Sequence, residues 1–165
     1  MKKKTVKSIF LIFIFIFLNA CNGYKPIFGS ADINFKISSH TISGDKVLGK
    51  QLYSKINNLS KSSKNDPSIP SINISINITK SKSATSKDST GKILEYKINL
   101  NTKIKIENVI NNKIILNQDT KSSLSYKVQD QYSDTASAEK ITIENLINNT
   151  YREILIILSK NMSLV

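Results

Sequence analysis

The stretch 72–79, Ile-Asn-Ile-Ser-Ile-Asn-Ile-Thr, decides the fold, because isoleucine alternates there with small polar residues. Side chains of a β-strand point alternately to opposite faces of the sheet, so this stretch predicts a strand with one buried and one solvated face. Two further stretches predict strands in the same way. Residues 32–42 and 96–107 carry apolar side chains on one face, namely Ile33, Phe35 and Ile37 in the first and Tyr96, Ile98, Leu100, Ile104 and Ile106 in the second.

A fourth strand is predicted after a tight turn. Asn111-Asn112 can adopt the positive φ angles of a hairpin turn, and residues 114–126 return from it. The apolar alternation of this return strand is interrupted at its centre, which indicates a sheet edge. The interrupting residues are Gln118, Thr120 and Ser122. Residues 80–92 are polar and without alternation, so we expect a loop there.

Two stretches have the spacing of an amphipathic helix. Residues 46–62 follow an N-cap at Asp45, and their apolar positions fall on one side of a helix. A second helix is predicted from a cap at Asp134 or Thr135 to Asn161. The buried stripes are Leu48, Leu52, Ile56 and Leu59 in the first helix and Ile143, Ile147, Ile154 and Leu158 in the second.

The predicted order is therefore strand, helix, three strands, helix. Each strand has one apolar face and each helix has one apolar stripe, so a single layer of helices can bury them all. We expect an α+β fold in which two helices pack on one face of a four-stranded, mostly antiparallel sheet. The other face carries asparagine, serine and lysine, which suits either solvent or the polar lumen of a large outer-membrane barrel.

Residues 1–20 have the layout of a secretory signal peptide. Four lysines are followed by an apolar run from Ile9 to Leu18 and by a short segment that ends in Ala20. The run is 10 residues long, whereas a transmembrane helix needs about 20. Export with cleavage is therefore favoured over a permanent membrane span.

Cys21, the only cysteine, stands at the predicted cleavage point. With Ala20 and Leu18 before it, it resembles a bacterial lipobox, whose thiol receives a diacylglyceryl group and whose amine receives an acyl chain. An ordinary signal peptide with an incidental cysteine is the alternative, but an odd cysteine in an exported chain needs a role, and two or three acyl chains give stable anchoring. We expect a signal peptide over 1–20, an acylated tether over 21–31 and an α/β domain over 32–165.

Membrane sorting is read from the residue after the cysteine. In enteric bacteria, the signal that retains a lipoprotein at the inner membrane resembles an aspartate at this position. This chain has Asn22 there instead. The outer membrane, on its periplasmic side, is therefore the favoured location.

The composition limits the class of partner. The chain has a net charge of +12, which falls to +8 when the four signal lysines leave. A basic surface attracts nucleic acid, acidic lipid or anionic glycan. Aromatic residues are not interleaved with the basic ones as a stacking platform requires, so we expect no nucleic-acid partner.

The sequence gives no indication of catalysis. His40 is the only histidine and no second thiol exists, which excludes a His/Cys metal site, and the carboxylates are scattered singly. A Ser-His-Asp set could be drawn from His40 and Asp45, but no nucleophile elbow surrounds any serine, and a surface histidine at a strand end is the alternative. We expect no enzyme, no metal and no cofactor beyond the lipid on Cys21.

Residues 21–29, Cys-Asn-Gly-Tyr-Lys-Pro-Ile-Phe-Gly, resemble the mature N-terminus of the LPS-assembly lipoprotein LptE family, especially its alphaproteobacterial type. Asn22 is an additional residue in that pattern. Residues 88–96 are similar to the family's acidic-x-x-glycine loop before an aromatic strand start, with Glu95 where a basic residue is common. Residues 125–138 resemble the tyrosine- and alanine-bearing segment before its last helix. The resemblance covers nearly the whole mature chain, and residues 21–29 are its specific part.

The resemblance implies that the domain plugs the lumen of the barrel protein LptD, assists the assembly of that barrel and helps to deliver lipopolysaccharide to the outer leaflet. Lipopolysaccharide carries phosphates and acidic sugars, which attract ammonium groups as point charges. We expect a binding cluster at the tip of the predicted loop, formed by Lys80, Lys82, Lys87, Lys92 and Lys127.

Three alternatives stay open. The lysines can be ordinary solvated residues of a lysine-rich chain. The protein can be a periplasmic adaptor lipoprotein of another envelope transport or secretion complex. It can also be a lipid- or glycan-processing enzyme whose site the sequence does not reveal.

Overall fold

Six elements follow one another in the predicted order. The computed structural model describes residues 34–60 and 69–162, so the predicted signal peptide, Cys21 and the tether lie outside the described residues. The elements are β1 (Lys36–Gly44), α2 (Lys46–Ser60), β2 (Ser71–Lys87), β3 (Ile93–Asn108), β4 (Ile114–Lys127) and α3 (Tyr132–Met162).

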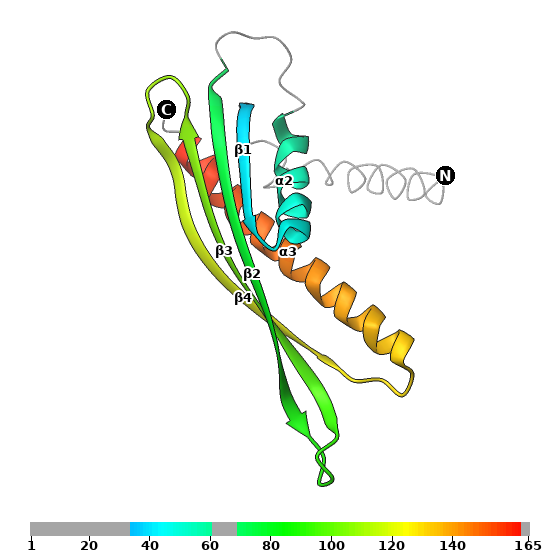
Figure 1. The fold of residues 1–165 in the computed structure, drawn as a ribbon. Coiled ribbons are helices and arrows are strands. Elements are labelled where there is room, and N and C mark those ends of the chain that lie inside the picture. The colour runs from blue at the N-terminus through cyan, green and yellow to red at the C-terminus, as the bar shows by residue number, and fades with distance from the viewer. Residues whose placement is uncertain (1–33, 61–68, 163–165) are drawn as a thin grey trace, which may run out of the picture. The chain divides into compact units, whose positions relative to one another are not determined.

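The strands form one sheet in the order β1-β2-β3-β4. β1 and β2 are parallel, because α2 crosses over between them, and the other two pairs are antiparallel. Both helices lie on the same face of the sheet (Figure 1). The predicted α+β class, the element order and the edge position of β4 are therefore confirmed. In the described part of the chain, neither helix has the length and apolar content needed to cross a membrane.

The isoleucines of β2 form the centre of the core. Ile74 is paired with Ile106 of β3, and Ile76 with Ile104, so apolar rows run across the sheet and face the helices. The core is completed from β1, β4 and both helices. Its fully buried large side chains are Phe35, Leu52, Ile56, Ile72, Ile74, Ile76, Ile78, Ile98, Leu100, Ile104, Ile106 and Leu146.

One part of the contact between the sheet and α3 is polar. Thr102 of β3 and Thr120 of β4 are cross-strand partners, and both are buried. Neither hydroxyl has a hydrogen-bond partner among the residues that the structure describes. A buried hydroxyl without a partner costs about 1–3 kcal/mol, so α3 covers this part of the sheet less favourably than an all-apolar contact would.

The start of α2 is set by a cap and a glycine. Asp45 caps the helix as predicted, since its Oδ1 accepts hydrogen bonds from the amides of Val47 and Leu48, each at 3.1 Å. Gly44 before it has a φ of 74°. A Cβ at this position would lie 2.1 Å from the carbonyl oxygen of Ile78, so the chain passes β2 at a distance that only glycine permits.

The prediction of a loop over 80–92 is wrong. β2 continues to Lys87 and β3 begins at Ile93, which leaves only residues 88–92 for the turn. Hydrogen bonds between the two backbones hold this part of the ladder, so it needs no apolar face, and the side chains of 79–87 are all exposed. β2 and β3 therefore form a hairpin whose far part projects beyond the helices (Figure 1).

Asp88 closes this hairpin. Its Oδ1 accepts hydrogen bonds from the amide and hydroxyl of Thr90, at 2.9 and 2.7 Å, and from the amide of Lys92 at 2.9 Å. These bonds, first of all the one from the Thr90 hydroxyl, hold the pKa of Asp88 below its ordinary value of 3.8. Gly91 supplies the positive φ of 87°. The acidic-x-x-glycine pattern of residues 88–91 therefore forms a tight turn.

Element ends differ from the prediction at two further places. A bulge at Ser38 shifts the register of β1, so that His40 and Ile42 share the helix-facing side with Ile37. α3 begins at Tyr132 rather than after a cap at Asp134 or Thr135. The Thr135 hydroxyl instead accepts a hydrogen bond from the amide of Gln129 at 2.8 Å, which fixes the loop before the helix.

Replacing Gly44 with alanine should destabilise the domain far more than replacing Gly91. Both have a positive φ, which costs another residue about 1–2 kcal/mol. At Gly44 the new Cβ would also meet the Ile78 carbonyl, whereas nothing lies within 4 Å at Gly91. Urea unfolding should give a loss of about 1–2 kcal/mol for Gly91→Ala and at least about 3 kcal/mol for Gly44→Ala. Equal losses would contradict the close approach.

Candidate functional site

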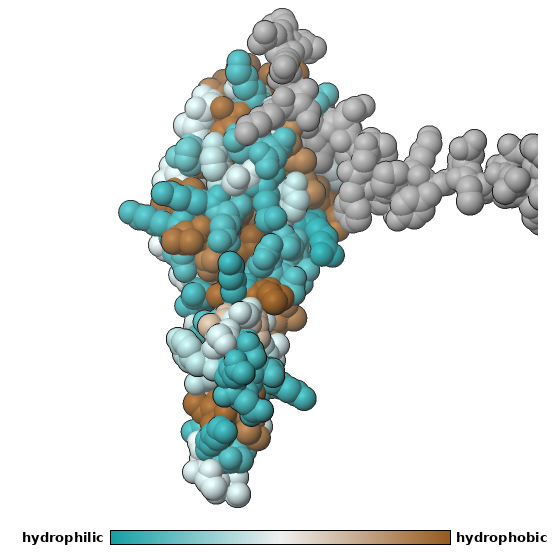
Figure 2. Space-filling model, turned by 90° about the vertical axis from the view of Figure 1, so that its right-hand side faces the viewer, coloured by the Kyte–Doolittle hydropathy of each residue, from teal (hydrophilic) through white to brown (hydrophobic). Residues whose placement is uncertain are grey.

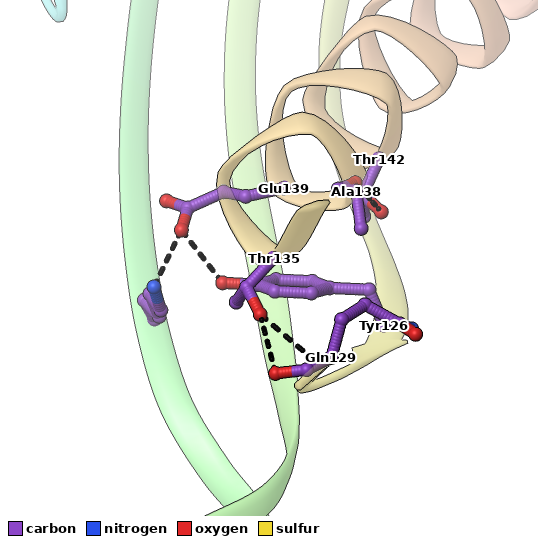
Figure 3. A network of polar contacts seen from close by, with 7 residues as sticks. Tyr126, Gln129, Thr135, Ala138, Glu139 and Thr142 are labelled. Atoms are coloured by element: carbon purple, nitrogen blue, oxygen red, sulfur yellow. Dashed lines mark hydrogen bonds and ion pairs between the residues drawn. The ribbon is translucent and has the colours of Figure 1, made fainter. Parts of the chain in front are cut away.

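Polar side chains from three elements meet where the β2–β3 hairpin projects past α3 (Figure 3). Lys82 of β2 continues the helix-facing side of the isoleucines, and its Nζ lies 2.5 Å from Oε2 of Glu139 on α3. The hydroxyl of Tyr126 on β4 donates a hydrogen bond to the same oxygen at 2.6 Å. One carboxylate of α3 therefore binds side chains of both β2 and β4.

Each group of this network shifts the pKa of its neighbours. The Lys82 ammonium, and after it the Tyr126 hydroxyl, hold the pKa of Glu139 below its ordinary value of 4.5. The hydrogen bond to Glu139 in turn raises the pKa of Lys82. Burial, and after it the bond to Glu139, raises the pKa of Tyr126. At neutral pH the site thus holds an ionised pair and a neutral tyrosine.

Two aromatic rings flank the Lys82 ammonium. Its Nζ lies 4.2 Å from the ring centroid of Tyr96 and 5.4 Å from that of Tyr126, and the two rings are 5.8 Å apart. The negative faces of aromatic rings attract a cation at such distances. The Lys82 ammonium therefore interacts mainly with groups of the protein itself, although its side chain is still 36% exposed.

A hollow of about 590 Å³ opens beside this network, between the hairpin and the start of α3. Two lysines and two carboxylates, Asp130 and the Lys82-bound Glu139, line it together with apolar and aromatic side chains, and hydrophobic surface is visible along the projecting part in Figure 2. A cation beside an apolar wall fits an anionic group attached to a sugar ring or hydrocarbon. The lining side chains with this character are Lys82, Lys92, Ile93, Tyr96, Val128 and Tyr132.

The five predicted lysines do not converge at a loop tip. Lys80 and Lys87 both lie within β2, where seven residues of extended strand separate them by about 23 Å. Lys127 ends β4, at the position paired with Glu95. Of the five, Lys82 and Lys92 line the same hollow. The predicted convergence of the five lysines is therefore wrong, because the loop that it assumed is mostly strand.

The face opposite the helices is polar, as predicted. It carries a shallow hollow of about 370 Å³ over the middle of β2, β3 and β4. The Oδ1 of Asn101 is buried there without a hydrogen-bond partner in the described part of the chain. Hydroxyl, amide and ammonium groups at this surface suit water or a polar partner, and those that line the hollow include Thr79, Ser81, Asn99, Asn101, Lys121 and Ser123.

The other residues considered for chemistry lie apart. His40 is exposed in the middle of β1 rather than at a strand end, and its ring stacks on Tyr53 of α2 with centroids 4.0 Å apart. Within residues 34–60 and 69–162, no three His, Cys, Asp or Glu side chains gather as a metal site would require.

Sequence reasoning missed the partners of Lys82, which are Glu139, Tyr96 and Tyr126. The sequence contained a signal for them. Lys82 is an even number of residues after Ile78, so in a continuing strand both side chains face the helices. A partly buried ammonium needs a carboxylate. Assigning residues 80–92 to a loop removed this phase information.

Replacing Glu139 with glutamine should lower the free energy of unfolding at pH 7 by about 1–2 kcal/mol, because Lys82 and Tyr126 lose an ionised acceptor. The pKa of Glu139 is lower in the folded protein than in the unfolded chain. The stabilisation by ionised Glu139 is therefore present above about pH 4.5 and is lost as the pH falls through the folded-state pKa. The difference between Glu139→Gln and the parent should therefore shrink in acid. Glu144→Gln, an exposed carboxylate on the same helix, is the control, and an equal loss there would refute the network's role.

No family model matches the sequence, and no curated protein matches it. Solved structures of similar fold exist. A protein of Caulobacter crescentus described as a lipoprotein has a TM-score of 0.55 and 12% identity, with 81% of this chain and 92% of that chain covered. Rare lipoprotein B of Shewanella oneidensis has a TM-score of 0.52 and 12% identity, with 76% and 98% covered. A minor lipoprotein of Acinetobacter baumannii has a TM-score of 0.52 and 17% identity, with 75% and 92% covered. The chain is thus similar in fold to bacterial proteins described as lipoproteins.

Proposed function

We propose that the protein is an outer-membrane lipoprotein of lipopolysaccharide export, held on the periplasmic side by an acylated Cys21 and bound to the barrel protein LptD. It is not an enzyme. It plugs the lumen of the barrel, assists its assembly and helps lipopolysaccharide to reach the outer leaflet. The observation that carries the proposal is the agreement of two likenesses, one of residues 21–29 to the LptE family and one of the fold to proteins described as lipoproteins.

The polar sheet face supports a barrel partner. The lumen of a large outer-membrane barrel is polar, so a plug must present groups that form hydrogen bonds over an extended surface. The face of β2, β3 and β4 does so, with the shallow hollow around Asn99, Asn101 and Ser123 at its centre. Its exposed pair Lys103 and Asp119, 3.6 Å apart, adds charge of both signs.

The hollow beside the hairpin supports a glycolipid ligand. Lys92 lines it without being part of the carboxylate network of Lys82, and Tyr96 and Val128 offer an apolar wall. A lipopolysaccharide phosphate would meet Lys92 while a sugar or acyl segment lies against that wall. Lys80, Lys87 and Lys127 contribute a more distant positive field.

A periplasmic adaptor lipoprotein of another envelope complex is the second candidate. A groove of about 880 Å³ between α2 and α3 favours it. Val47 is 67% exposed there, and Ile143 also lines the groove among charged and polar side chains, so it could receive an amphipathic partner helix.

The test of the barrel partnership is co-purification of the full-length protein from detergent-solubilised membranes, expected as a one-to-one complex with LptD. Ser123→Trp puts a bulky side chain on the polar face and should reduce the recovered barrel at least severalfold. Ser137→Trp makes the same change at an exposed position of α3 and should leave recovery unchanged. A complex with a different envelope protein would instead support the adaptor, and recovery without any barrel would reject the proposal.

Replacing Lys92 with glutamine should weaken lipopolysaccharide binding about fivefold, because one charge contact of about 1 kcal/mol is lost. Lys50→Gln removes the same charge from the exposed surface of α2 and is the matched control. Lys82 stays unchanged, since its replacement would also break the contact with Glu139. The affinity is measured by titration with purified lipopolysaccharide. Equal affinities of the two variants would reject the hollow as the binding site and would leave the proposed anchoring untouched.

A further inference from the structure

The turn between β3 and β4 exposes apolar side chains at one end of the sheet. Ile110 is 85% exposed, Ile114 49% and Val109 39%. Exposed single apolar residues are common, but three within a six-residue segment form a local apolar tip. The tip is defined here as Val109, Ile110 and Ile114.

Hydrogen bonds hold the apolar tip in this arrangement. The Oδ1 of Asn108 accepts from the amides of Ile110 and Asn111, at 2.8 and 3.4 Å. The Oδ1 of Asn111 accepts from the amide of Lys113 at 3.0 Å, and Asn112 has a φ of 52°. The polar side chains of the turn therefore bind its own backbone, while the apolar ones point outward.

The apolar tip lies at the end of the sheet where the chain enters the domain. The amide of Val109 donates to the carbonyl of Ser71 at 2.9 Å, and Ser71 is paired with Lys36, the first residue of β1. Figure 1 shows the β3–β4 turn, the start of β1 and the end of α3 at the same end. The chain before residue 34 therefore joins the described domain beside this tip.

We infer that the apolar tip inserts into the surface of the lipid bilayer that holds the anchor. The inference rests on the proposed lipidation of Cys21. Residues 22–33 span at most about 40 Å when extended, so the anchor keeps this end of the sheet within reach of the bilayer. The exposed Lys113 lies within the same turn, and the exposed Lys36 begins β1 at the same end of the sheet, where both can meet anionic head groups. A lipid chain and a second apolar contact together fix the orientation of the domain at the membrane.

The chain has no tryptophan, so a single substitution creates a specific reporter. Ile110→Trp is placed in the full-length protein, which is processed in cells, purified and reconstituted in vesicles of phosphatidylethanolamine and phosphatidylglycerol containing brominated lipid. Ser137→Trp is the matched control. Ser137 is exposed on α3, whose last turn contacts β4 through the bond from Asn161 to the Ile115 carbonyl, so a helix length of about 35 Å separates Ser137 from the tip.

The expected result is blue-shifted emission and loss of fluorescence in brominated vesicles for Trp at 110, with neither change for Trp at 137. Ile114→Trp provides a second reporter if the first variant does not fold. Intact mass is measured on the same samples. Acylated protein whose Trp at 110 and at 114 stays unquenched overturns the inference and leaves the proposed function standing. A missing acyl mass overturns the anchoring, and the inference with it.

Discussion

The one-sided burial of the sheet is the constraint on which the rest of the structure depends. The alternating isoleucines of β2 can be covered from one side only, because every residue between them is polar. Both helices must therefore share a face, and the crossover α2 must return the chain beside β1 to make the parallel pair. The polar face is left uncovered by helices as a direct consequence, and it is the surface that the proposed barrel partner would contact.

The Lys82–Glu139–Tyr126 network marks the limit of that burial. Towards the core, α3 covers most of the sheet with apolar contacts, and beyond the network the β2 arm of the hairpin continues with all its side chains exposed. A charged contact suits this border, because it is partly solvated and needs a fixed geometry. It also gives α3 a defined position where the neighbouring contact through Thr102 and Thr120 supplies little favourable energy.

The sequence predicted the fold class, the element order and most core residues, since these follow from periodicity, as in residues 72–79 and 96–107. It did not predict the extent of β2, because residues 80–87 form strand through backbone pairing and carry no apolar alternation. The candidate site was lost with it. Contacts such as Lys82 with Glu139 join residues 57 apart, and their meeting depends on the length of a hairpin that side-chain patterns do not encode.

The position of α3 at the end of the chain affects how the protein becomes folded. Synthesis delivers β1 to β4 first, so a complete sheet can exist while its isoleucine side still lacks the longer of its two covers. Such an intermediate exposes apolar surface and is prone to aggregation until residues 132–162 cover it. The last helix therefore controls when the newly made chain stops being prone to aggregation.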